Sequence, residues 1–132
     1  MTSALFRFAL IGTAGFGVNE AALWVALRIL DLNNHLGFVV AFFVAVTFTW
    51  FGNRTLTFHE RAARGIRAVP LEWLKFVSAN ALGAVVNYGV YAATISFAPS
   101  PANSPYVALA CGTVIGLVFN FTLSSAVVFR TR

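Results

Sequence analysis

Four long apolar runs, separated by short polar segments, constrain this chain more than any other feature. The runs cover about residues 5–30, 36–58, 71–97 and 106–129. Each is long enough for a helix that crosses a bilayer, which needs about 20 mostly apolar residues. Of the 132 residues, 59% are hydrophobic and 10% are charged, and mean hydropathy is +0.81. Soluble domains carry roughly 25% charged residues, so we expect an all-α membrane protein with four transmembrane helices in a single domain over residues 1–132.

The segments between the runs have the composition of loops. The first connection, Asp31 to Asn34, is a cluster of turn-forming residues. The second, residues 59–70, is basic and ends at Pro70, which together with Glu72 is typical of a helix start. The third, residues 98–105, holds three prolines and cannot continue a helix. The chain is therefore expected to form two helical hairpins joined by a basic loop.

The positive charges predict how the hairpins face the membrane. Eight of the nine Lys and Arg residues lie near the termini or the central loop, namely Arg7, Arg54, Arg61, Arg64, Arg67, Lys75, Arg130 and Arg132. With four spans, all eight lie on one side, and only Arg28 lies near the other. Loops rich in Lys and Arg stay in the cytoplasm. We therefore expect both termini and the central loop to be cytoplasmic, with anionic lipid rather than nucleic acid as the partner of the basic residues.

The two halves of the chain, about residues 1–58 and 71–130, resemble each other. The pair Arg7 and Phe8, then Gly15 and Asn19, recurs 68 residues later as Lys75 and Phe76, then Gly83 and Asn87. In the second runs, Phe48 and Phe58 recur 71 residues later as Phe119 and Phe129. An even number of spans per half makes such repeats parallel. The repeat is asymmetric in its polar groups, because Asn53 and Arg54 correspond to serines.

Arg54, near the end of the second run, has two interpretations. A guanidinium keeps its charge, so a position inside the membrane is costly. Arg54 then either extends to the membrane boundary as a snorkelling side chain or binds an anion, and its planar set of donors suits phosphate. Neither interpretation is excluded by the residues alone.

Glu20 and two asparagines are the other polar groups inside the runs. Glu20 is thirteen residues beyond Arg7, about 20 Å of helix, which places it on the outward side of the midplane. It either joins helices as a neutral or hydrogen-bonded group, takes part in substrate or proton binding, or is hydrated near the outer interface. Asn19 and Asn87 correspond across the repeat, so they are equally candidates for hydrogen bonds between helices.

Residue patterns that carry catalysis or metal binding are missing from the sequence. The two histidines, His35 and His59, lie at the ends of runs, without metal-ligand spacing to Cys111 or a carboxylate. There is no phosphate-binding glycine loop and no nucleophile elbow. We therefore expect no enzyme, no metal and no cofactor. Cys111 lies in an apolar run and is expected to be a small packing residue.

The end of the second run also carries a resemblance to a known family. Phe51-Gly52-Asn53-Arg54-Thr55-Leu56-Thr57-Phe58 is similar to the corresponding ending in GtrA-like proteins, small four-helix bacterial membrane proteins. Arg7 and Phe8, and their repeat at Lys75 and Phe76, add to the likeness, which covers nearly the whole chain. The resemblance implies a bacterial inner-membrane protein of cell-surface polysaccharide synthesis. It further implies translocation, or flipping, of a polyprenyl-phosphate-linked sugar.

The parts of such a substrate need different binding groups, and each part can be assigned to residues of the chain. The apolar tail stays in lipid, while the phosphate needs a cation at the cytoplasmic entrance and the sugar needs polar partners further in. For the phosphate we expect Arg54, Asn53, Arg7 and Lys75; for the polar path we expect Asn19, Glu20, Asn87 and Asn120. The alternative is a non-transporting adaptor that anchors or recruits a glycosyltransferase through Arg61, Arg64 and Arg67.

The alternatives make different structural predictions. A translocator needs a polar cavity within the bundle or at a dimer seam, whereas an adaptor has Arg54 and Glu20 paired with protein groups and no cavity. A small multidrug-type exporter fits the size of the chain and its single intramembrane Glu, but it fits the parallel repeat and the Asn-Arg ending less well. Because four helices are few for a pathway, we also expect a homo-oligomer, most simply a dimer.

Overall fold

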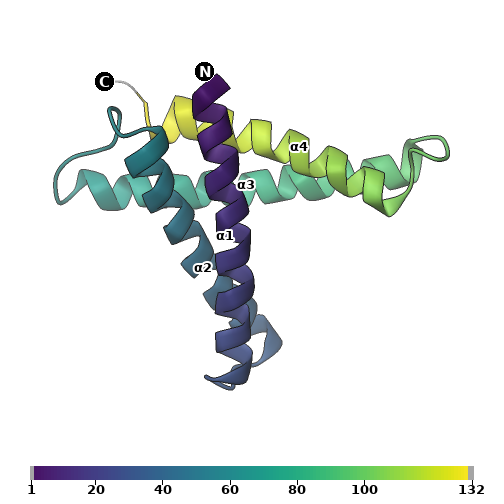
Figure 1. Ribbon diagram of the computed structural model, residues 1–132, viewed down its shortest axis with the longest axis horizontal. Coiled ribbons are helices and arrows are strands. Elements are labelled where there is room, and N and C mark those ends of the chain that lie inside the picture. Colours follow the sequence, from purple (N-terminus) through teal and green to yellow (C-terminus); the bar gives the residue numbers. More distant parts are fainter. Residues whose placement is uncertain (1, 131–132) are drawn as a thin grey trace.

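The computed structural model describes residues 2–130, apart from the side chain of Tyr106; Arg132, one of the predicted cytoplasmic cations, lies outside this range. The chain forms four long helices, α1 (Thr2–Arg28), α2 (Asn34–Gly52), α3 (Ala68–Phe97) and α4 (Pro105–Leu123) (Figure 1). Two π-helical turns, η1 (Asn53–Thr57) and η2 (Ser124–Val128), extend α2 and α4. Within residues 2–130 there is no strand. The prediction of an all-α chain with four spans is therefore confirmed.

The helices have the length and surface of membrane spans. All four are long and apolar enough to cross a bilayer. Many large apolar side chains point outward; Phe16, for example, is 67% exposed. Water would disfavour such a surface, but the hydrocarbon of a bilayer accepts it.

Local sequence explains where the second and fourth helices begin. The side chain of Asn33 accepts a hydrogen bond from the backbone N–H of Leu36 at 2.9 Å, which caps the start of α2. Ser104 caps α4 in the same way, through the N–H of Val107 at 3.3 Å, and Pro105 occupies the first turn. Both capping residues belong to the predicted connections, and they cap the helices because their short side-chain oxygens satisfy otherwise free N–H groups.

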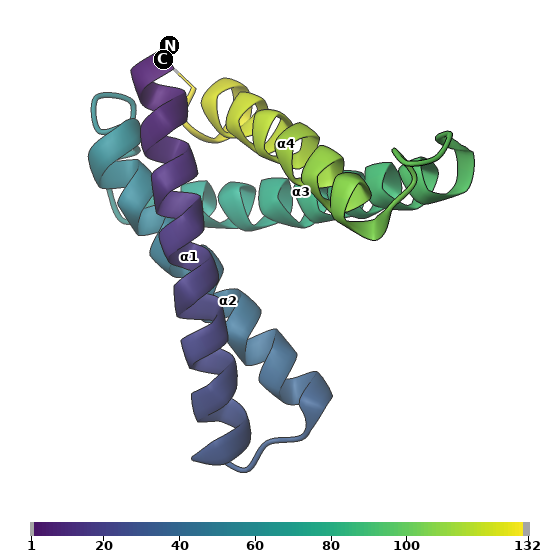
Figure 2. The ribbon, with the colours of Figure 1, turned by 45° about the vertical axis from the view of Figure 1, so that its right-hand side comes forward.

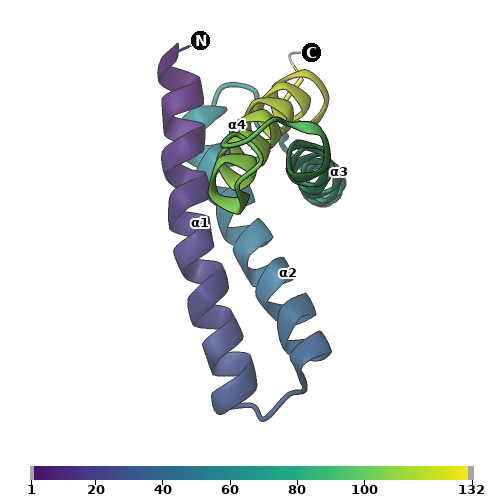
Figure 3. The same cartoon turned by 90° about the vertical axis from the view of Figure 1, so that its right-hand side faces the viewer.

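The helices pair as two hairpins, α1 with α2 and α3 with α4. The hairpins meet near the chain termini and point in different directions away from that junction (Figures 1 and 2). Figure 3 shows the second hairpin crossing the upper part of the first. The two chain ends therefore lie at the same end of the molecule. Which side of the membrane this end faces remains a prediction from the positive charges.

A cluster of aromatic residues forms the core where the hairpins meet. The rings of Phe58 and Phe129 stack with centroids 4.7 Å apart. Phe8 packs edge-on against Phe58 at 6.3 Å and 64°, and Phe76 packs edge-on against Phe129 at 6.1 Å and 63°. The two edge-on contacts correspond to each other in the repeat, because Phe76 follows Phe8 by 68 residues and Phe129 follows Phe58 by 71. Aromatic pairs of this kind add to stability beyond the area that they bury, so the core holds the hairpins together at this end.

Candidate functional site

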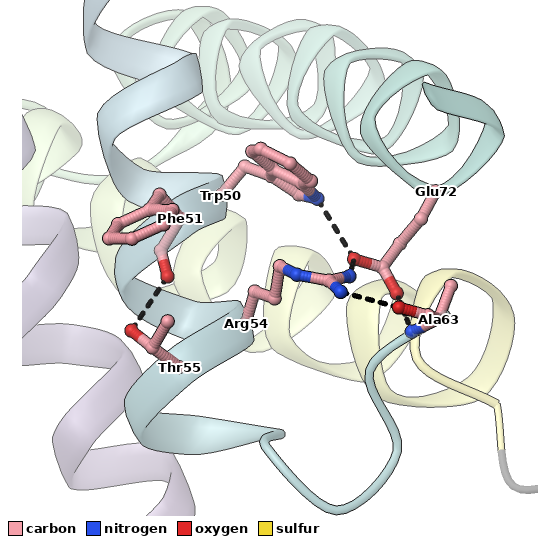
Figure 4. A network of polar contacts seen from close by, with 6 residues as sticks. All are labelled: Trp50, Phe51, Arg54, Thr55, Ala63 and Glu72. Atoms are coloured by element: carbon pink, nitrogen blue, oxygen red, sulfur yellow. Dashed lines mark hydrogen bonds and ion pairs between the residues drawn. The ribbon is translucent and has the colours of Figure 1, made fainter. Parts of the chain in front are cut away.

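Arg54 lies in η1, at the end of the junction where the central loop returns to α3. Its guanidinium donates to the carboxylate of Glu72 and to the carbonyl of Ala63, and it lies over the ring of Trp50 at 5.6 Å (Figure 4). The Arg54 side chain is 19% exposed. The predicted anion partner of this arginine is thus, in this structure, a carboxylate of the protein itself.

The carboxylate of Glu72 receives three donors from separate parts of the chain. Besides Arg54, the indole N–H of Trp50 donates to it at 3.1 Å and the backbone N–H of Ala63 donates to its second oxygen. Its side chain is only 2% exposed. A buried charge persists only when it is paired and hydrogen-bonded. Glu72 therefore ties α2, η1 and the central loop to α3. Sequence reasoning assigned it only to a helix start, because its partner lies eighteen residues upstream.

The other predicted phosphate cations are engaged elsewhere or exposed. Arg7 on α1 donates to the carbonyl of Leu56 at 2.9 Å, and Lys75 on α3 is exposed. Arg61 donates to the carbonyl of Ser125 at 3.2 Å. The last carbonyls of a helix lack partners within it, and basic side chains commonly supply them. Arg7 and Arg61 thus stabilise the ends of η1 and η2 and do not join the contacts around Glu72.

Asn53 is buried and turns its amide toward the interior. Its Nδ2 donates to the carbonyl of Thr49 at 2.9 Å, and its Oδ1 accepts from the hydroxyl of Thr57 at 2.9 Å. On the next residue of the same turn, Arg54 points toward α3. One more hydroxyl of this segment stays local, since Thr55 donates to the carbonyl of Phe51 at 2.8 Å (Figure 4). The two predicted site residues therefore belong to two adjoining environments.

A cavity of about 400 Å³ lies between the hairpins, and amide side chains supply much of its polar surface. Its polar lining residues are Asn19, Thr49, Asn53, Asn80, Asn87, Thr113 and Asn120. They come from all four helical segments, and no charged side chain belongs to the described lining. Each amide has two donor positions and an acceptor, and the amides of Asn53 and Asn80 already use one donor on a backbone carbonyl. The arrangement is suited to a neutral ligand with many hydroxyl groups.

Three of the four residues predicted for a polar path line this cavity. They are Asn19 on α1, Asn87 on α3 and Asn120 on α4, whereas Glu20 lies on the exposed surface of α1 and does not line the cavity. Asn80, which sequence reasoning missed, also lines it. Asn80 and Asn87 are seven residues apart, a spacing that places them on one face of a helix. That spacing was the available signal.

Glycines make room for the amides of the cavity. A side chain at Gly83 would overlap the amide of Asn120, and a Cβ at Gly112 would lie 2.6 Å from Oδ1 of Asn87. Oδ1 of Asn120 is buried and has no hydrogen-bond partner among the described residues. A buried polar atom without a partner is costly. This oxygen lies against Gly83 and is the least satisfied acceptor among the amides of the cavity.

Comparison with known proteins places the chain in a family. The family model described as the GtrA/DPMS transmembrane domain matches residues 7–129. No curated protein matches the chain. The family is associated with the handling of glycosyl-linked lipids and with flippase-like function, and its members are in general non-enzymatic membrane proteins. The match spans all four helices, and this multi-pass membrane protein belongs to the GtrA/DPMS transmembrane domain family.

Proposed function

We propose that this protein translocates a polyprenyl-phosphate-linked sugar across the bacterial inner membrane for cell-surface polysaccharide synthesis. The observation that carries the proposal is the amide-lined cavity between the hairpins. Its volume of about 400 Å³ falls in the range typical of small-molecule sites, roughly 300–1,000 Å³. The described lining holds no charged side chain, and its amides stand among glycines and apolar residues; such a cavity fits the sugar head of such a lipid.

The energetics of crossing support this assignment. A hydroxyl moved from water into hydrocarbon without a partner costs about 4–8 kcal/mol, and a hexose carries several hydroxyls. The amides of Asn19, Asn87 and Asn120 would replace the lost water partners. The apolar exterior of the helices leaves the polyprenyl tail in lipid. The protein then needs to shelter only the head group.

The phosphate of the substrate is charged and needs a binding site with cations, apart from the neutral cavity. We assign it to the end of the junction that carries Arg54, next to Asn53, with Arg7 and Lys75 as exposed cations that raise the local positive potential. Because Asn53 also lines the cavity, a phosphate near Arg54 would adjoin the space proposed for the sugar. Membrane lipid would surround the remaining surface.

The test is translocation in vesicles that contain no other protein. Purified protein is reconstituted into liposomes, radiolabelled farnesyl-phosphoryl-glucose is added to the outer leaflet, and the fraction protected from an impermeant oxidant is followed with time. We expect protection to develop faster than in protein-free vesicles. Vesicles carrying glucosylceramide, a sugar lipid without phosphate, provide the comparison. Equal rates with and without protein would contradict the proposal.

An adaptor that recruits a glycosyltransferase is the second candidate. It predicts the pairing of Arg54 with a protein group, as with Glu72, and one surface feature also favours it. Ile66 in the central loop is 93% exposed and lies between Arg64 and Arg67, which are also exposed. An exposed apolar residue flanked by cations fits a protein or lipid contact. The adaptor predicts no translocation by the protein alone. It also predicts that replacing both arginines by glutamate abolishes co-purification with a co-expressed glycosyltransferase.

A further inference from the structure

The contacts of Glu72 form an anion-binding site that a side chain of the protein already fills. The donors come from Arg54 in η1, Trp50 in α2 and the backbone of Ala63 in the central loop (Figure 4). All three surround one carboxylate, which is almost completely buried. The carbonyl of Ala63 accepts from the second terminal nitrogen of Arg54 and holds the guanidinium in place. The guanidinium is thus fixed by more than the anion that it binds.

This set of donors suits a phosphate as well as a carboxylate. A guanidinium binds either group through parallel N–H donors, and backbone N–H groups add to many phosphate sites. The indole N–H of Trp50 is a donor only, so it favours an anion over a cation. The Arg54 side chain retains 19% exposure, so part of it is open to the surroundings. An incoming phosphate would meet Arg54 before the other two donors.

The charges also balance in an exchange. A sugar linked through phosphate to a polyprenol is a phosphodiester and carries one negative charge, as the carboxylate does. Exchange of one for the other leaves Arg54 neutralised, whereas loss of Glu72 alone would leave a partly buried cation without a partner. Lys75, exposed on α3, follows Glu72 by three residues. Residues at this spacing are neighbours on a helix surface, so Lys75 is placed to pair with a displaced carboxylate.

We propose that Glu72 is an internal substitute for the substrate phosphate, and that the phosphodiester of the lipid-linked sugar displaces it from Arg54, Trp50 and Ala63. This inference rests on the proposed function, since it names where the phosphate of that substrate binds. Asn53, the residue before Arg54, lines the cavity, whereas Arg54, Trp50 and Glu72 do not, so the proposed phosphate position is one residue along η1 from the sugar site. Displacement also breaks the hydrogen bond from the N–H of Ala63 to Glu72. The central loop then loses this contact with α3.

The test compares binding of farnesyl-phosphoryl-glucose to detergent-purified wild type and to two glutamate variants. In Glu72→Gln the competing charge is absent, so the donors are open to phosphate. If Glu72 leaves these donors unoccupied in one molecule in ten or fewer, the Glu72→Gln variant should bind the lipid about tenfold more tightly, or more. Glu60→Gln removes the same charge from an exposed residue of the central loop, and we expect less than a twofold change. Arg54→Ala combined with Glu72→Gln should lose the gain.

Folding and ligand source are controlled separately. Each variant is checked by circular dichroism and gel filtration; if Glu72→Gln fails to fold, Glu72→Asp retains the charge but shortens its reach, and we expect tighter binding there too. Folded variants that bind no tighter than wild type would show that Glu72 is only a structural partner. Farnesol, inorganic phosphate and phosphatidylglycerol identify the source, and equal tightening for phosphatidylglycerol would overturn the assignment to lipid-linked sugar.

The outcomes separate this inference from the proposed function. Tighter phosphate binding in Glu72→Gln without translocation by wild type would support the phosphate site and contradict the translocator. Translocation by wild type without tighter binding in the variants would support the translocator and overturn the role of Glu72 as a substitute for phosphate.

Discussion

At the scale of single residues, the cavity depends on pairs of a glycine and a polar side chain. Gly83 receives Asn120, its repeat counterpart Gly15 receives Thr49, and the backbone and amide of Asn87 lie against Gly112. Glycines let neighbouring helices approach closely in a membrane. In this bundle the space beside the glycines takes the amides of Asn120 and Asn87 and the methyl group of Thr49, so side chains that line the cavity fit between the helices.

Substitution of one such glycine should destabilise the bundle. In Gly83→Ala the new methyl group would overlap the Asn120 amide, and overpacking of this kind costs about 1–3 kcal/mol. We expect a lower unfolding temperature in detergent and weaker binding of the sugar lipid. Gly89→Ala on the same helix meets nothing within 4 Å, so it should leave both measurements unchanged. Equal stability of the two variants would refute the close packing at Gly83.

The sequence predicted some of the polar residues and could not predict others. Arg54, Asn19, Asn87 and Asn120 stand out because polar groups in apolar runs need a reason. The partnership of Arg54 with Glu72 depends on how the central loop folds back, which no local pattern encodes. Adjacent residues on a helix are separated by about 100°. Asn19 and Glu20 therefore cannot both face the cavity, and the sequence could not decide between them.

At the scale of elements, the π-helical turns stand out. Residues 53–57 and 124–128 are offset by 71, as predicted for the second runs of the two halves, and each turn leads into a buried phenylalanine. The N–H groups of Phe58 and Phe129 donate to the carbonyls of Asn53 and Ser124 at 2.8 Å. The hydropathy pattern predicted helix through these residues but not the wider turn, since apolar content does not distinguish the two. The turns place both rings in the core.

Removal of one stacked ring should loosen the junction of the hairpins. Phe129→Ala deletes a fully buried ring from the aromatic cluster, and such deletions cost about 3–5 kcal/mol in soluble cores. We expect a marked loss of stability in mixed-micelle unfolding. Phe97→Ala, at an 87% exposed position on α3, supplies the comparison and should be nearly neutral. A neutral Phe129→Ala would show that the cluster does not hold the hairpins together.

At the scale of the whole molecule, two hairpins meet at one end and diverge from it (Figure 2). Residues of both hairpins line the cavity. Four spans and their pairing were predictable, because long apolar runs and short connections leave few alternatives. The direction of one hairpin relative to the other was not predictable from the sequence. Hydropathy indicates which segments contact lipid, but it does not indicate the angle at which helices cross. The central claim at this scale is that the cavity is the path of the sugar head.

The most direct test of that claim is the translocation rate of farnesyl-phosphoryl-glucose in vesicles containing the double variant Asn19→Ala and Asn87→Ala. Both amides line the cavity from different hairpins. Loss of one hydrogen bond to an uncharged group costs about 0.5–1.5 kcal/mol, so two lost bonds should slow translocation by roughly 5- to 150-fold. The control Asn103→Ala, in the exposed loop before α4, should match wild type. A folded double variant that translocates at the wild-type rate would contradict the account.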